Sequence, residues 1–233
     1  MRWLILITSI VFSISLLNVD SISQVREKFK GEYKGKEKKE EAKTEEKKTE
    51  QPSTIKIEIT GNVIFLDDFA EYGEGDIPSK WEIEKGSGEV VTYRGRRWLK
   101  IFSSDFVAKP LIKLLPQNYR IEFDVILGGY YNAVKLTFLT ARGEEPYWIF
   151  FDHITAKSER GASTSISLDV KSINKVTLEV KNNSLRCLIN GKTVLYEARV
   201  FDKPANAIRL KVEYASADSP TYISNFAVYN LTK

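Results

Sequence analysis

Hydrophobic and polar residues alternate in short runs from residue 55 onward, and this two-residue period constrains the fold more than any other feature. Successive side chains of a β-strand point to opposite faces, so each run predicts a strand with one buried face. Clusters of Gly, Pro, Asn and Asp separate the runs, and no long helical period competes with them. The clearest runs are residues 55–59, 98–101, 120–125, 134–138, 166–168 and 176–180.

The sharpest turn signal is Asn190-Gly191, which lies between the apolar segments 185–189 and 193–196. A type I′ turn needs positive φ at both central residues, which Asn and Gly tolerate best, so we predict a tight hairpin here. We expect about a dozen short strands in residues 55–233, which is typical of an all-β, two-sheet antiparallel β-sandwich. Its core should contain most of the aromatic residues, among them Phe65, Phe69, Trp81, Trp98, Phe123 and Phe138.

The N-terminus has a different character. An apolar run at residues 3–17 follows Arg2 and precedes the small residues Ser21 and Ser23, which is typical of a signal peptide spanning residues 1–23. This pattern predicts export to the periplasm or the cell surface. The alternative is an uncleaved membrane anchor, although 15 helical residues rise only about 22 Å against a hydrocarbon core of about 30 Å. We expect membrane contact only through this segment, if it is uncleaved.

Residues 24–54 contain ten Lys or Arg and eight Glu, with few apolar residues to bury. Such a segment cannot form a core, so we predict a solvated tether that is disordered or transiently helical. The interleaved glutamates weaken the alternative of a basic arm that binds an acidic polymer.

The scarcity of certain residues excludes several kinds of chemistry. One His, one Cys and one Met cannot form a Cys/His zinc site, a disulfide framework or a haem attachment motif. The 35 Lys and Arg are nearly balanced by 31 Asp and Glu, so the charge predicts no nucleic-acid partner. We expect no cofactor, because no glycine-rich phosphate loop precedes a helix. Asp67, Asp68 and Asp76 match no defined calcium loop and more simply indicate a turn.

Six stretches occur in an order that resembles concanavalin A-like, or laminin G-like, jelly-roll domains. More narrowly, the order is similar to the domain that precedes an OmpA-type module in some bacterial envelope proteins. The sequence has no such module after the sandwich, so it departs from that architecture and the resemblance does not extend to wall anchoring by that module. The stretches are VIFLDDF (63–69), GDIPSKW (75–81), GSGEVV (86–91), WLKI (98–101), LPQNYRIEFDV (115–125) and YISNF (222–226).

This resemblance raises the question of catalysis, because the fold includes retaining glycosidases whose strand carries Glu-x-Asp-x-Glu. Such enzymes need two carboxyl groups about 5 to 5.5 Å apart. Glu122 and Asp124 match the first two positions, but Ile126 occupies the third. We therefore expect no enzyme, with Glu122 and Asp124 as outward-facing polar residues of a half-buried strand.

Two other groups of reactive side chains are predicted not to be catalytic. Asp152 and His153 are adjacent, and neighbours in a regular strand face opposite ways, so we predict no catalytic dyad. Cys187 is in phase with Leu185 and Ile189, which predicts a buried, inert thiol rather than a nucleophile.

Two aromatic pairs lie near predicted loops, where rigid sandwiches place binding groups. Tyr130-Tyr131 follows two glycines, and Tyr147-Trp148 follows a turn that contains Arg142. Because adjacent strand residues face both ways, we expect one aromatic of each pair in the core and the other free to stack on a sugar ring. The candidate ligand-binding residues are therefore Tyr130, Tyr131, Arg142, Tyr147 and Trp148, together with Glu122 and Asp124.

The first hypothesis is an exported, non-catalytic module that binds glycan or another cell-envelope polymer. A protein-interaction or scaffold module with an envelope protein as its partner is the alternative. A glycoside hydrolase-like enzyme is the third.

Overall fold

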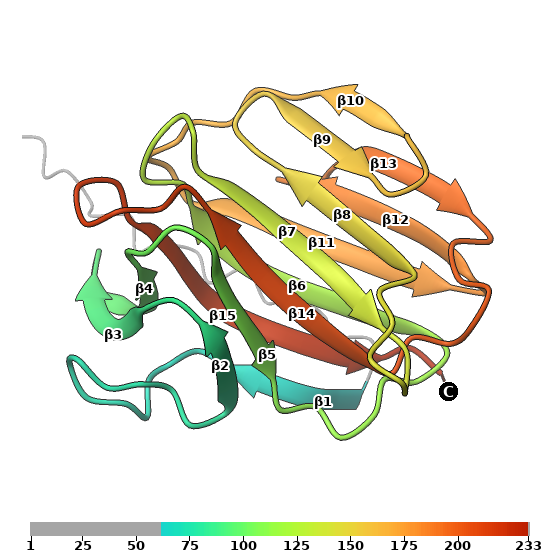
Figure 1. Ribbon diagram of the computed structural model, residues 1–233, viewed down its shortest axis with the longest axis horizontal. Helices are drawn as coiled ribbons and strands as arrows, with labels where there is room; N and C mark the ends of the chain where they lie inside the picture. The colour runs from blue at the N-terminus through green and yellow to red at the C-terminus, as the bar shows by residue number, and fades with distance from the viewer. Residues whose placement is uncertain (1–61, 233) are drawn as a thin grey trace, which may run out of the picture. The chain divides into compact units, whose positions relative to one another are not determined.

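The computed structural model describes residues 62–232, which form two stacked antiparallel β-sheets (Figure 1). None of these residues belongs to a helix that could span a membrane. Sheet A comprises β1 (Asn62–Asp67), β3 (Gly88–Tyr93), β4 (Arg96–Ile101), β6 (Tyr119–Ile126), β11 (Asn174–Lys181), β12 (Ser184–Ile189), β13 (Lys192–Ala198) and β15 (Thr221–Asn230). Sheet B comprises β2 (Trp81–Lys85), β5 (Phe106–Pro110), β7 (Ala133–Leu139), β8 (Tyr147–Phe151), β9 (Thr155–Ser158), β10 (Ser163–Ser165) and β14 (Ala207–Glu213).

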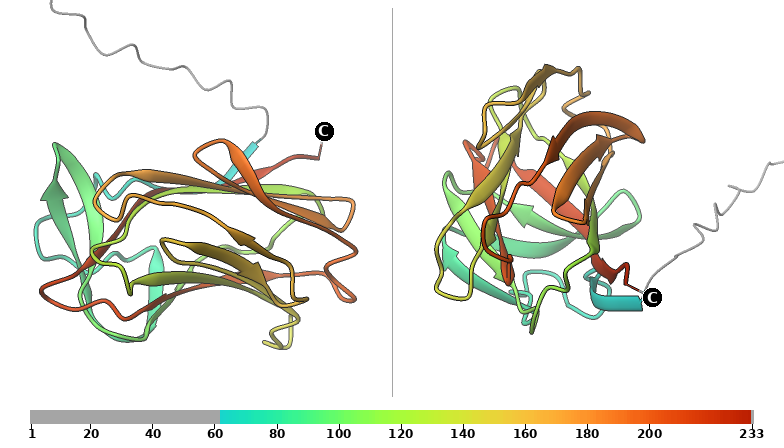
Figure 2. Two further views of the ribbon diagram at one scale, coloured as in Figure 1. Left: turned by 90° about the horizontal axis from the view of Figure 1, so that it is seen from above. Right: turned by 90° about the vertical axis from the view of Figure 1, so that its right-hand side faces the viewer.

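The predicted all-β, two-sheet sandwich is confirmed. Sheet A has the order β13-β12-β11-β6-β15-β4-β3, with β1 pairing with β15 beside this path. Sheet B has the order β10-β9-β8-β7-β14-β5-β2. The side views in Figure 2 show the two sheets as separate layers, and the core fills the space between them.

The two-residue period explains the core. In β6, Ile121, Phe123 and Val125 are buried, whereas the residues between them are only partly covered. The aromatic residues predicted for the core are all buried, and Trp81 contacts Phe65, Phe69 and Phe226 there. The core members are Phe65, Phe69, Trp81, Phe123 and Phe138.

Trp98 is also buried, but on the outer face of sheet A. Its β4 neighbours Leu99 and Ile101 belong to the core, so the Trp98 side chain points the other way. The Arg96 guanidinium lies 4.1 Å from its ring centroid, and Tyr222 packs edge-on against it.

Most predicted strands are present, and one is not. The runs at 98–101, 120–125, 134–138 and 176–180 are confirmed as parts of β4, β6, β7 and β11. The run at 166–168 forms no strand, so that prediction is wrong. Its alternation arises because Ile166 and Leu168 pack against the core from a loop whose amides donate to the carbonyls of Ile154 and His153.

The Asn190-Gly191 hairpin is confirmed. The two residues connect β12 to β13, and their φ angles are 52° and 78°. The predicted strand at 55–59, the signal peptide (1–23) and the tether (24–54) lie outside the described residues.

The strand register defines two ends of the sandwich. Asn62 pairs with Asn230, which pairs with Tyr119, so β1 begins and β15 ends at the same place (Figure 2). We call this the terminal end, and it includes the loops 111–118, 140–146 and 199–206. The opposite, distal end includes the loops 127–132, 152–154 and 214–220.

Candidate functional site

Glu122 and Asp124 lie on the outer face of sheet A, as expected for polar residues of a half-buried strand. Glu122 Oε2 is 3.1 Å from Lys175 Nζ, and its Oε1 is 3.7 Å from Arg120. Asp124 Oδ2 is 2.9 Å from Arg96 Nη1 and also accepts a hydrogen bond from Asn225. Both carboxylates are therefore engaged by cations.

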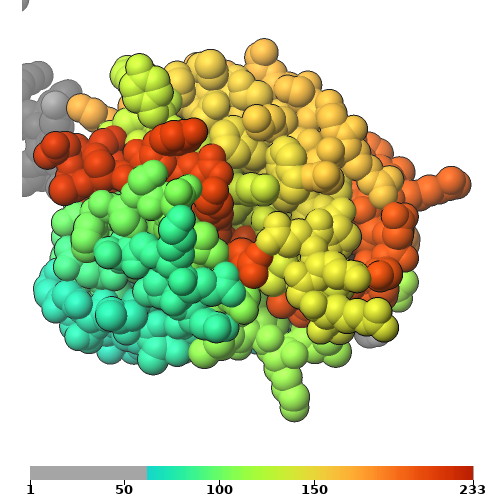
Figure 3. Space-filling model, viewed as in Figure 1, coloured from blue at the N-terminus to red at the C-terminus, as the bar shows by residue number. Residues whose placement is uncertain are grey.

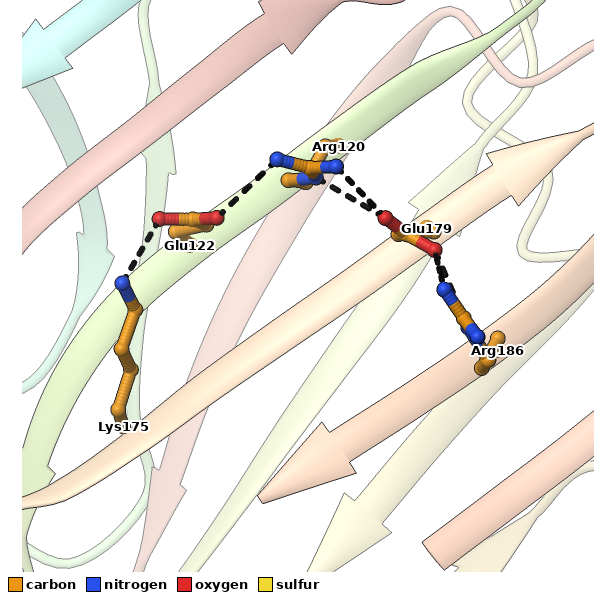
Figure 4. Close-up of polar contacts among 5 residues, drawn as sticks. All are labelled: Arg120, Glu122, Lys175, Glu179 and Arg186. Carbon is orange, nitrogen blue, oxygen red and sulfur yellow. Dashed lines mark hydrogen bonds and ion pairs between the residues drawn. The ribbon is translucent and has the colours of Figure 1, made fainter. Parts of the chain in front are cut away.

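A wider ion-pair network extends across β6, β11 and β12 (Figure 4). Arg120 donates from Nε and Nη2 to Glu179 Oε1 at 3.1 and 2.8 Å, while Arg186 donates to Glu179 Oε2. Burial alone would raise the pKa of Glu179, but the hydrogen bonds from Arg186 and Arg120 lower it below its usual range. In Figure 4, Arg120 lies between the carboxylates of Glu122 and Glu179. The network ties three strands together and holds the Glu179 carboxylate in its charged form.

The outer face of sheet B has a different character, because it carries half-buried aromatic rings that point outward. Tyr147, Ile149 and Phe151 of β8 are buried, so Trp148 and Phe150 point outward. This alternation confirms that one aromatic of the Tyr147-Trp148 pair is in the core.

Each of these outward rings has a lysine beside it. Lys135 Nζ lies 4.5 Å from the centroid of Trp148, and Lys157 Nζ lies 4.5 Å from that of Phe150. The strand register explains this pattern, because Lys135 and Lys157 flank Phe150 on the neighbouring strands. Neither lysine forms an ion pair with any other residue in the range 62–232.

A hollow of about 450 Å³ adjoins the aromatic rings on this face. Lys135 and Thr137, the cross-strand neighbours of Phe150 and Trp148, form one side of it. In Figure 3, orange atoms of β14 lie in a recess between the green segment of β2 and β5 and the yellow segment around β8. The lining residues are Glu84, Lys85, Asp105, Val107, Lys135, Thr137, Glu145, Arg209 and Lys211.

Arg209 organises the polar groups of the hollow. Its Nε lies 2.8 Å from Glu84 Oε2, and its Nη1 pairs with Glu145. Glu84 Oε1 is also 2.7 Å from Lys109 Nζ. Burial would raise the pKa of Glu84, but Lys109 and Arg209 lower it overall. Carboxylates that accept hydrogen bonds and cations that donate them thus alternate along this face of the sheet, from Lys109 through Glu84 and Arg209 to Glu145.

The second predicted aromatic pair does not follow the strand rule. Tyr130 and Tyr131 are 65% and 85% exposed, so the expectation that one of them is in the core is wrong. They lie in a turn between β6 and β7, where side chains do not alternate between two faces. Tyr130 packs edge-on against His153, with 5.1 Å between the ring centroids.

The seven candidate residues are therefore not gathered at one place. Trp148 lies on the outer face of sheet B, and Tyr147 lies in the core. Tyr130 and Tyr131 lie at the distal end, whereas Arg142 is exposed in a terminal-end loop. Glu122 and Asp124 lie on the opposite sheet from Trp148.

The remaining polar candidates have structural roles. Asp152 Oδ1 accepts hydrogen bonds from the amides of Ile154 and Thr155, so it closes the turn beside His153 instead of bonding its imidazole. Cys187 is buried, as predicted, and burial raises the pKa of its thiol to about 12.

The aspartates near β1 also serve local structure. Asp67 accepts hydrogen bonds from the Phe69 amide and the Trp81 indole, each at 2.9 Å, and Asp76 accepts one from the Gly73 amide. No group of three or more His, Cys, Asp or Glu within residues 62–232 is placed to hold a metal ion.

Sequence reasoning missed most of the sheet B hollow. Phe150 follows Trp148 by two residues, so the period of β8 alone would have placed both rings on one face. Arg209, Glu84 and Glu145 come from distant parts of the chain, and only the strand register brings them together.

No family model matches the sequence, and no curated protein matches it either. Among solved structures, a sialidase matches with a TM-score of 0.59 and 13% identity, over 74% of this chain and 19% of the sialidase chain. A protein of unknown function with a galectin-like fold from Bacillus subtilis matches with a TM-score of 0.50 and 14% identity, over 73% of this chain and 96% of the other. The domain is a galectin-like, concanavalin A-like jelly roll.

A Bacillus licheniformis beta-glucanase has the same jelly-roll fold, with a TM-score of 0.52 and 12% identity, over 73% of this chain and 99% of the glucanase. The jelly roll thus spans nearly the whole glucanase but about a fifth of the sialidase. At these identities the likeness establishes the fold alone. The narrower resemblance to domains that precede OmpA-type modules stays a prediction.

Proposed function

We propose that this jelly roll is a non-catalytic glycan-binding module whose ligand lies along the outer face of sheet B. The observation that carries the proposal is the position of Trp148, which is held outward by a rigid strand beside a polar hollow. Binding sites combine apolar surface with a few polar groups that fix orientation. Trp148 and Phe150 supply flat apolar surface, and the hollow supplies the polar groups.

The groups in the hollow suit sugar hydroxyls, which both donate and accept hydrogen bonds. Glu84 and Glu145 offer acceptor oxygens, and Arg209 and Lys135 offer donors. The names of two structural neighbours, a beta-glucanase and a sialidase, are those of carbohydrate-acting enzymes, which is consistent with this use of the fold.

The state of the carboxylates supports a binding role over hydrolysis. Retaining glycosidases need one free carboxylate as nucleophile and a second carboxyl group as acid. Here Glu122 and Asp124 are held by cations, and Ile126 is buried at the third position of the motif. In the hollow, Glu84 and Glu145 share Arg209.

The proposal includes export. The apolar run at residues 3–17 has the pattern of a signal peptide, which would deliver the module to the periplasm or cell surface. Cell-envelope polysaccharides are the glycans present there, so they are the proposed ligands.

A glycan array followed by calorimetry tests the proposal. We expect the wild-type protein to bind at least one polysaccharide and Trp148→Ala to weaken that binding about tenfold, because the stacking surface is lost. Tyr130→Ala, which removes an exposed ring at the distal end, is the matched control and should bind as the wild type does. The proposal fails if the folded protein binds no polysaccharide, or if Trp148→Ala binds equally well.

One observation favours a second function, the docking of an envelope protein. Four exposed apolar side chains, Tyr130, Tyr131, Ile154 and Tyr214, lie in three neighbouring loops at the distal end. Exposed apolar surface of this kind marks interaction sites. A protein partner whose binding is weakened by Tyr131→Ala, but not by Trp148→Ala, would support this function.

A further inference from the structure

An apolar cleft of about 450 Å³ opens at the terminal end of the jelly roll, beside the ends of β6 and β11 in sheet A. It shares no lining residue with the hollow on sheet B. Loops 111–118 and 199–206 form its sides, together with the first residue of β6 and the end of β11. The lining residues are Leu115, Pro116, Gln117, Tyr119, Val180, Asn183, Phe201, Asp202, Pro204 and Ala205.

Tyr119 brings an unpaired polar group to this cleft. The residue is 2% exposed and packs near Phe138, with 6.4 Å between the ring centroids. Its hydroxyl has no hydrogen-bond partner among residues 62–232. Burial raises the pKa of Tyr119, so the hydroxyl stays protonated and remains a donor. Buried polar groups nearly always have partners, so this unpaired hydroxyl is a donor available to a ligand in the cleft.

The other polar residues of the cleft do not supply that bond. Asn183 uses its side-chain amide on the backbone of Phe201, donating to the carbonyl at 2.7 Å and accepting from the amide at 2.8 Å. Asp202 is 94% exposed and lies at the rim. It is the only charged residue in the lining, and its negative charge disfavours an anionic ligand.

We infer that this cleft binds a small, uncharged, largely apolar molecule with one hydroxyl or carbonyl oxygen that hydrogen-bonds to Tyr119. The apolar lining of Leu115, Val180 and Phe201 contacts the body of the ligand, and Tyr119 fixes its orientation. A volume of about 450 Å³ lies within the range of known small-molecule sites. A charged ligand is excluded because the cleft offers no buried counter-charge.

The test compares p-cresol, toluene and p-toluate as probes in NMR titrations of the full-length protein. We expect p-cresol and toluene to shift the amide signals of Leu115, Val180 and Ala205, and p-toluate to leave them unchanged. Tyr119→Phe keeps the cleft and removes the hydroxyl. It should raise the Kd of p-cresol about fivefold and leave that of toluene within about twofold.

Two controls keep the test decisive. Tyr119→Phe without ligand should unfold at a temperature at least as high as the wild type, because the change deletes an unpaired buried group. Ala205→Phe, which fills the cleft, should abolish binding of both neutral probes. The inference is overturned if no probe binds. Equal p-cresol affinity in wild type and Tyr119→Phe also overturns it.

Discussion

The Tyr147 hydroxyl of sheet B donates a hydrogen bond to Glu197 Oε2 of sheet A at 2.6 Å. The Ser158 hydroxyl, also on sheet B, donates to the other carboxylate oxygen of Glu197 at 2.5 Å. One carboxylate of β13 therefore joins two strands of the facing sheet. Burial, and then the hydrogen bond to Glu197, raises the pKa of Tyr147, so the hydroxyl remains a donor well above neutral pH.

Removing this bond should loosen the contact between the sheets. We expect Tyr147→Phe to lower the free energy of unfolding by about 2 kcal/mol, because a hydrogen bond to a charged group is lost. Urea denaturation at pH 7 measures this change. Tyr196→Phe, at an exposed position next to Glu197 on β13, should be neutral. Equal stabilities of the two variants would show that the Tyr147 bond contributes nothing.

Acid should weaken the ion-pair network of sheet A. The pKa of Glu179 lies below its ordinary value of 4.5, so the unfolded chain takes up this proton at a higher pH than the folded chain. The stabilising contribution is therefore complete above pH 4.5 and is lost as the pH falls through the lowered pKa. Denaturation curves from pH 7 to pH 3 should show this loss in the wild type.

Glu179→Gln tests whether Glu179 is the source of this loss of stability in acid. We expect it to lower the free energy of unfolding at pH 7 by about 2 kcal/mol and to flatten the dependence on acid pH. Glu89→Gln, which breaks the more exposed ion pair with Lys100, should change stability by less than about 0.5 kcal/mol. If the free energy of unfolding of Glu179→Gln falls with acid pH as steeply as that of the wild type, Glu179 is not the source of the pH dependence.

Gly128 is required by a close approach between two distal loops. A Cβ atom at this position would lie 2.0 Å from the carbonyl oxygen of Pro220, so the backbone itself must move. We expect Gly128→Ala to lower the free energy of unfolding by about 3 kcal/mol. In Gly191→Ala the new atom meets nothing within 4 Å, and only the φ of 78° is unfavourable, so the loss should be about 1 kcal/mol. The reverse order of stabilities would be incompatible with this packing.

The thiol of Cys187 should be unreactive in the folded protein, because it is buried and its pKa is raised to about 12. At pH 8 we expect a thiol reagent such as DTNB to react at least about a hundredfold more slowly than in guanidinium chloride. The rate of absorbance change measures the difference. Rapid labelling of the native protein would mean that β12 is exposed in solution.

The strands could be predicted from the sequence because each needs only its own alternation of apolar and polar residues. The same rule correctly placed one aromatic of the Tyr147-Trp148 pair inside and the other outside. It failed at Tyr130 and Tyr131, because a turn after two glycines does not alternate. It also gave a false strand at 166–168, where a loop packs two side chains onto the core.

The candidate site was harder to predict, because its partners come from separate strands. Arg209 meets Glu84 only because β14 lies beside β5 and β5 beside β2. The order of strands in a sheet is a property of the whole chain, and no local pattern encodes it. The ion pairs of Glu122 with Lys175 and of Glu179 with Arg120 depend on the register of β6 and β11 in the same way.

The pairing of Asn62 with Asn230 has a mechanical consequence. Because β1 and β15 are antiparallel and their outer ends are adjacent, tension between the two termini would act across the strands and not along them. The backbone hydrogen bonds of β1 would then break one after another, as in a zipper, and not all together. A pull on both ends of the domain would peel β1 away first, while β15 stays held by β6 and β4.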